Sequence, residues 1–102
     1  MMAEVDTIIH QPTRLKIMMA LLGVEEADFN FLQSALGLTA GNLSTHASKL
    51  EEAGLVEITK RFAGKLPVTT YRLTDEGRER LDEYWRAIDE IRATPGSMAE
   101  EE

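Results

Sequence analysis

This 102-residue chain has no cysteine, which excludes disulfide bonds, thiolate metal sites and cysteine nucleophiles. No apolar run approaches the roughly 18 residues of a membrane span, and the N-terminus lacks the basic and then apolar pattern of a secretory signal. We therefore expect a cytoplasmic protein with no membrane partner. Only two histidines are present, His10 and His46. No HExxH-like spacing accompanies them, so we expect no metal and no cofactor.

Basic residues are scarce as well. There are 11 Lys and Arg against 18 Asp and Glu, a formal net charge of −7. An acidic chain is repelled by nucleic acid, so any contact with it requires a local concentration of positive charge. Residues 60–72 supply one, with four basic side chains and no acidic one: Lys60, Arg61, Lys65 and Arg72. No nucleophile–base pair, phosphate loop or paired-carboxylate site stands out, and we expect a protein that is not an enzyme.

The length and the hydrophobic fraction of 43% are those of one globular domain. We place this domain at residues 1–93, with an N-terminal arm and a C-terminal helix. Residues 94–102 are rich in acid and contain proline and glycine, which is typical of a disordered acidic tail.

Four segments have helical signals. The first runs from Pro12 to Gly23, with an apolar stripe predicted at three- and four-residue spacing: Leu15, Met18, Met19 and Leu22. The second runs from Asp28 to Gly37, since a glycine can end a helix in the left-handed conformation. The third covers 40–53, capped by Thr39, and the fourth follows Thr74, another predicted N-cap.

Residues 55–62 and 68–73 are rich in β-branched and aromatic residues, and Gly64 and Pro67 lie in the segment between them. This pattern predicts two antiparallel strands joined by a loop. The expected fold is therefore mainly α with a small β-hairpin. It is a winged helix-turn-helix, with a three-helix core, a wing and a C-terminal dimerisation helix.

The third helix has an unusual polar side. Leu43, Ala47 and Leu50 fall on one face, and short side chains occupy the opposite face and its flanks: Gly41, Asn42, Ser44, Thr45, Ser48, Lys49 and Glu52. Such side chains permit close approach to the major groove of DNA, where Asn pairs with adenine and Lys bonds guanine or a phosphate. Thr39 leaves the backbone N–H groups of the helix N-terminus directed at a phosphate.

The stretches "LGLTAGNLSTHASKLEEAGLVE" and "YRLTDEGRERL" resemble the MarR/ArsR-like winged-helix transcriptional regulators over about residues 12–92. The resemblance implies a homodimeric, sequence-specific regulator that binds double-stranded DNA. Its third helix would enter the major groove, and its wing would reach the adjacent backbone or minor groove. By position, the residues that resemble recognition-helix contacts are Asn42, Ser44, Thr45, His46 and Lys49, and those that resemble wing contacts are Arg61 and Lys65.

The last helix carries a long apolar stripe of Leu81, Tyr84, Trp85, Ile88 and Ile91. This stripe is longer than the three-helix body and hairpin can cover, and an exposed apolar helix face usually marks a partner. We therefore expect a two-fold dimer, with Val5, Ile8 and Ile9 of the arm at the same interface.

Two points stay open at the level of sequence. Acidic residues near the third helix (Glu51, Glu52, Glu57) and an apolar wing tip at Leu66 and Pro67 favour an alternative, a winged-helix protein–protein interaction module that no longer binds DNA. His46 is either a DNA ligand or a structural histidine, half-buried against the second helix. No residue singles out a small-molecule effector.

Overall fold

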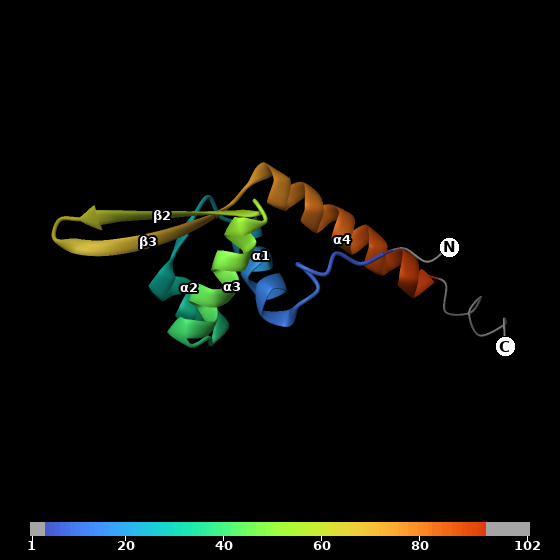
Figure 1. Cartoon of the computed structure of the whole chain (residues 1–102), viewed down its shortest axis with the longest axis horizontal. Coiled ribbons are helices and arrows are strands. Elements are labelled where there is room, and N and C mark those ends of the chain that lie inside the picture. The colour runs from blue at the N-terminus through green and yellow to red at the C-terminus, as the bar shows by residue number, and fades with distance from the viewer. Residues whose placement is uncertain (1–3, 94–102) are drawn as a thin grey trace.

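The computed structural model describes residues 4–93 of the chain (Figure 1). Its elements follow in the order α1 (Pro12–Leu22), β1 (Ala27–Asp28), α2 (Phe29–Leu36), α3 (Ala40–Glu52), β2 (Val56–Ala63), β3 (Leu66–Leu73) and α4 (Asp75–Ala93). The predicted winged helix-turn-helix is confirmed, including the C-terminal helix. The acidic tail predicted at 94–102 lies outside the described residues.

The helices begin where polar side chains satisfy the free N–H groups of the first turn. Asp28 accepts from the N–H of Phe31 at 2.7 Å, and Thr39 accepts from the N–H of Asn42 at 3.1 Å. Thr74 Oγ1 does the same for the N–H of Gly77 at 2.9 Å. The tight turn between α2 and α3 depends on Gly37, whose φ of 65° lies in the left-handed region that glycine adopts without strain.

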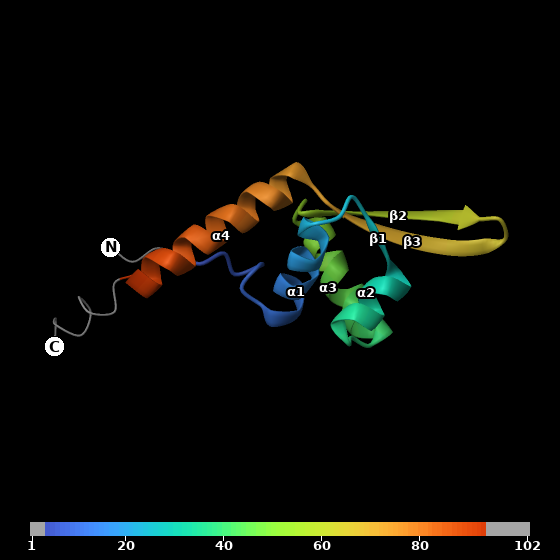
Figure 2. The same ribbon diagram turned by 180° about the vertical axis from the view of Figure 1, so that it is seen from behind.

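The wing is an antiparallel hairpin that pairs from Val56 with Leu73 out to Ala63 with Leu66. Pro67, expected in the loop, lies in β3 opposite Phe62, and the turn itself is Gly64 and Lys65. A third strand was not predicted: β1 pairs with β3, giving the order β1-β3-β2. In Figures 1 and 2 the outer half of the hairpin projects beyond α2 and α3.

The core differs from the predicted stripe on α1. Ile17, Met18 and Leu21 are fully buried, whereas Met19 is 42% exposed and Leu22 is 36% exposed. Buried side chains from the other elements complete one cluster, including Leu32, Leu43, Ala47, Leu50, Leu55, Val56, Tyr71, Leu73 and Leu81. The helix face predicted to pack the core is thus correct for α3 and displaced for α1.

The N-terminal arm runs beside α4 (Figure 2). Asp6 forms an ion pair with Arg80 at 2.8 Å, and His10 Nδ1 lies 2.9 Å from the hydroxyl of Tyr84. The far half of α4 extends away from the helical body (Figures 1 and 2). None of the described helices is long and apolar enough to cross a membrane.

Three residues expected at the dimer interface belong instead to the core of the single chain. Ile9 is fully buried, and Leu81 and Tyr84 are at most 4% exposed. The arm and the near half of α4 cover one another, so these side chains need no partner for their burial. The exposed part of the predicted stripe is smaller: Trp85 is 37% exposed, and the half-buried members are Val5, Ile8, Ile88 and Ile91.

Candidate nucleic-acid interface

Helix α3 presents its short polar side chains to solvent. Leu43, Ala47 and Leu50 are fully buried, while the exposed positions are Gly41, Asn42, Ser44, Thr45, Ser48, Lys49 and Glu52. The division of the helix into two faces is therefore as predicted. The first turns of the exposed face combine hydroxyl and amide groups with little bulk, and Lys49, Glu51 and Glu52 add one ammonium and two carboxylates toward the end of the helix. A grooved surface rich in donors and acceptors can therefore approach the first turns closely.

His46 lies at the edge of this face, is half-buried as the structural alternative expected, and forms a hydrogen bond with Arg14 of α1. Its Nδ1 is 3.2 Å from Arg14 Nη1, and Arg14 Nε donates to the carbonyl of Ile8 at 2.6 Å. Because a guanidinium only donates, Nδ1 is the acceptor and Nε2 carries the proton. Burial, together with the charges of Arg14 and Lys49, lowers the pKa of His46. The ring is therefore neutral at pH 7.

The folded wing has fewer unpaired positive charges than the sequence of residues 60–72 suggests. Arg61 pairs with Glu26 at 3.4 Å and Arg72 pairs with Glu57 at 3.0 Å. Glu26 and Glu57 lie outside residues 60–72, so the composition of that segment does not include them. Two cations of the wing, Lys60 and Lys65, are exposed and have no ion pair within residues 4–93. They are the wing charges available for a phosphate.

A hollow of about 370 Å³ separates α3 from the sheet. It is lined by Phe29, Ser44, Ser48, Glu51, Ile58, Lys60, Thr69 and Tyr71. Burial and the nearby Glu51 carboxylate raise the pKa of Tyr71, so its phenol is protonated and can donate. Ser48 was predicted on the exposed face of the third helix and Lys60 in the basic segment, but neither was among the residues matched to DNA contacts. The alternation of β2 places Lys60 on the same face as Ile58.

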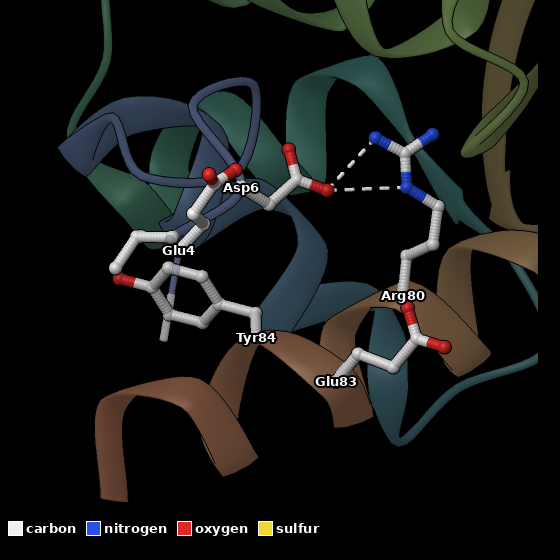
Figure 3. A pocket seen from close by; sticks show the side chains of 6 residues that line it. Glu4, Asp6, Arg80, Glu83 and Tyr84 are labelled. Atoms are coloured by element: carbon white, nitrogen blue, oxygen red, sulfur yellow. Dashed lines mark hydrogen bonds and ion pairs between the residues drawn. The ribbon is translucent and has the colours of Figure 1, made fainter. Parts of the chain in front are cut away.

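A second hollow, of about 230 Å³, lies where the arm meets α4 (Figure 3). Asp6 points at Arg80 across it, and Glu4, Glu83 and Tyr84 complete most of the lining. Burial raises the pKa of Asp6, but hydrogen bonds from Arg80 and the Ile9 N–H outweigh it and lower the pKa overall. Arg80 is thus held by a carboxylate, and the remaining lining includes two more carboxylates, Glu4 and Glu83. Within residues 4–93, no group of three His, Asp or Glu side chains is placed to hold a metal ion.

Comparison with known proteins defines the class. Residues 13–92 match the family described as winged helix DNA-binding domain, so this chain belongs to that family, as the resemblance to winged-helix regulators implied. A transcriptional regulator homologue from Pyrococcus horikoshii OT3 has a similar structure, with 36% identity and a TM-score of 0.79 over 84% of this chain and 85% of that one.

Two further proteins are similar at different levels of identity. An uncharacterized protein of Methanocaldococcus jannaschii is 39% identical over 77 residues, which cover 76% of this chain and 84% of that protein. Bacillus subtilis PadR, solved in complex with operator DNA, shares the fold with 21% identity and a TM-score of 0.65. The match covers 74% of this chain and 47% of PadR.

Proposed function

We propose that this protein is a transcriptional regulator that binds a specific sequence of double-stranded DNA as a homodimer. The observation that carries the proposal is the exposed face of α3, where Asn42, Thr45 and Lys49 stand on a helix whose opposite face is fully buried. A helix held this rigidly by its core can present base-reading groups at fixed positions. In this proposal α3 lies in the major groove.

The two parts of the surface have different roles. Asn42, Thr45 and Lys49 read base edges, whereas Ser44 and His46 position the helix against the backbone. Thr39 caps α3, and the N–H groups of the first turn face a phosphate. Lys65 at the turn of the wing, with Lys60 beside it, contacts phosphates and thereby contributes affinity without sequence preference. Arg61 adds to this contact only when it leaves Glu26.

The relatives support this reading. The Pyrococcus horikoshii protein is described as a transcriptional regulator homologue, and PadR shares the fold and binds operator DNA. The exposed part of α4 supports a dimer. Trp85, Ile88 and Ile91, with Val5 and Ile8 of the arm, form the interface in this proposal. Two linked half-sites then compensate for the few cations that each chain offers.

A second candidate is a winged-helix module that binds another protein. Glu51 and Glu52 lie on α3 itself, and two of the four wing cations are neutralised by acids of the same chain. Both features weaken the attraction of a duplex and favour a partner that is less negatively charged.

Binding to a random duplex library, with rounds of enrichment and a salt series, decides between the two. A regulator enriches a palindrome with half-sites about one helical turn apart, roughly 34 Å. Its affinity then falls linearly in the logarithm of salt concentration, by a slope of about 0.9 for each phosphate contact. Absence of enrichment together with absence of binding at low salt contradicts the proposal and directs the search to a protein partner.

A further inference from the structure

The outer half of the wing exposes two large apolar side chains. Phe62 is 73% exposed and Leu66 is 70% exposed, more than any other large apolar residue of the described chain. Single apolar residues on a surface are common. These two lie on a hairpin that projects past α2 and α3 (Figure 1), with no described element covering it.

The register of the hairpin separates the two residues. Side chains two apart on a strand share a face, so Phe62 follows Ile58 and Lys60, and its partner Pro67 follows Tyr71 and Thr69. Ile58, Lys60, Thr69 and Tyr71 line the hollow beside α3. Phe62 and Pro67 therefore continue the face of the wing that is turned toward α3. Leu66 pairs with Ala63 and lies on the other face.

Charge accompanies the apolar pair. Lys60 precedes Phe62 by two positions and lies on the same face, and Lys65 occupies the turn beyond Phe62. Both ammonium groups are exposed and unpaired within residues 4–93. An apolar ring between two free cations complements the edge of a duplex, where phosphates border apolar sugar and base surfaces. It does not suit an apolar protein surface, which would leave the two charges without partners.

We propose that Phe62, backed by Pro67, is an apolar wedge that enters the minor groove beside the α3 contact and bends the duplex. Phe and Pro are among the side chains that wedge between base steps, and such insertion kinks DNA by roughly 20–90°. Lys60 and Lys65 hold the flanking phosphates. The inference rests on the proposed function and adds to it. The energy needed to bend a duplex depends on its sequence, so bending contributes to the choice of binding site without hydrogen bonds to bases.

The test compares the full chain with Phe62→Ala, Phe62→Trp and the matched control Leu66→Ala on the enriched duplex. Dissociation constants and the end-to-end distance of a doubly labelled duplex are measured over a salt series. We expect Phe62→Ala to weaken binding about tenfold and to leave the duplex straighter. Phe62→Trp retains both properties, and Leu66→Ala stays within about twofold of the unmodified chain.

The salt series identifies the nature of the contact. Phe62→Ala leaves the salt slope unchanged because an apolar contact releases no counterion, whereas Lys60→Ala lowers the slope by about 0.9. Unchanged affinity in Phe62→Ala, an unchanged bend, or an equal loss in Leu66→Ala overturns the wedge. Failure of the unmodified chain to bind any duplex overturns the proposed function itself, so the two failures are distinguishable. Since Phe62 is largely exposed, its replacement does not disturb the core.

Discussion

At the scale of single residues, the exposed side chains of the interface differ in what they can offer a duplex. Asn42 presents an amide with both donor and acceptor, which matches adenine in the major groove. Lys65 presents only a charge. We expect Asn42→Ala to lose about 1–3 kcal/mol of discrimination at one base position, while Lys65→Ala weakens binding to all sequences alike and lowers the salt slope by about 0.9.

Competition binding against a panel of single-base variants of the enriched site measures this difference. Lys16→Ala serves as the control, because Lys16 is exposed on α1, away from the α3 face and the wing. Identical profiles for Asn42→Ala and Lys65→Ala would contradict the assignment of base reading to α3 and of phosphate contact to the wing.

His46 shows what residue-level reasoning from the sequence could and could not reach. Its position at the edge of the groove-facing surface follows from the 100° turn per residue. Its contact with Arg14 does not, because the two residues are 32 positions apart and meet only through the packing of α1 on α3. The same limit applies to Arg61 with Glu26, which are 35 positions apart, whereas Glu57 lies opposite Arg72 in the register of the predicted hairpin. Ion pairs between distant segments help to decide which cations remain free, and no local pattern records them.

At the scale of elements, the parts predicted correctly are those with local signals. Thr39, Thr74 and Gly37 mark helix ends through interactions with residues a few positions away. The two-residue strand β1 has no such signal, since it exists only through its pairing with Thr70 and Tyr71 of β3. The stripe on α1 was misplaced for a related reason: apolar residues occupy most of that helix, and the neighbouring helices decide which of them are covered.

At the junction of the wing with α4, Gly77 has no room for a side chain. A Cβ at this position would overlap the carbonyl oxygen of Leu55 and would lie 3.0 Å from Leu73 Cδ1. Leu55 O is fixed because it accepts from the N–H of Thr74 at 3.0 Å. We expect Gly77→Ala to destabilise the protein by about 1–3 kcal/mol, the usual cost of overpacking, in denaturant unfolding.

Gly41→Ala is the matched control for Gly77→Ala, because nothing lies within 4 Å of a Cβ at position 41. Alanine in a helix is about 0.5–1 kcal/mol more favourable than glycine, so this variant should be slightly more stable than the unmodified chain. Destabilisation of both variants to the same degree would show that loss of glycine itself, and not the contact with Leu55, is the cause.

The arm is joined to α4 by a charge pair with a defined pH dependence. Arg80 is 29% exposed and Asp6 is 21% exposed, with Nη2 at 2.8 Å and Nε at 3.1 Å from the same carboxylate oxygen. The folded pKa of Asp6 is lowered, so its contribution is present above the unfolded pKa and is lost as pH falls through the folded pKa. Asp6→Asn should cost about 1–2 kcal/mol at neutral pH.

Unfolding in denaturant from pH 7 to pH 2 checks this expectation. The unmodified chain should lose its advantage over Asp6→Asn below about pH 4, the ordinary pKa range of an aspartate. Asp89→Asn is the control, because its pair with Arg92 at 2.9 Å is exposed on both sides and should contribute little. A constant difference between the unmodified chain and Asp6→Asn down to pH 2 would show that the charge of Asp6 is not the stabilising feature.

At the scale of the whole molecule, the proposed DNA-binding surface and the proposed dimer surface lie on different parts of the chain. The wing lies at one end, the helical body that contains α3 lies in the middle, and the far half of α4 extends to the other end (Figures 1 and 2). The packing of the arm against α4 already buries three residues within the single chain: Ile9, Leu81 and Tyr84. In the proposed dimer, the surface left for a second copy is the exposed part of the α4 stripe, with Val5 and Ile8 of the arm as further candidates. A dimer formed there would place two α3 helices on one duplex, with the two-fold axis of the protein on that of the operator.

The final prediction concerns this interface. Ile88→Glu places a charge in an apolar contact and should convert the dimer to a monomer in sedimentation equilibrium, while the far-ultraviolet circular dichroism stays unchanged because Ile88 is only half-buried in the single chain. Affinity for the full palindrome should then fall by about 10²-fold or more, the gain that linked binding sites usually give, whereas affinity for an isolated half-site stays the same. Arg86→Gln, on the same helix and exposed, lowers the net charge by the same single unit and controls for it. Should Ile88→Glu remain a dimer that binds the palindrome fully, the pairing surface must lie elsewhere. The exposed stripe of α4 would then be excluded as the dimer interface of the proposed regulator.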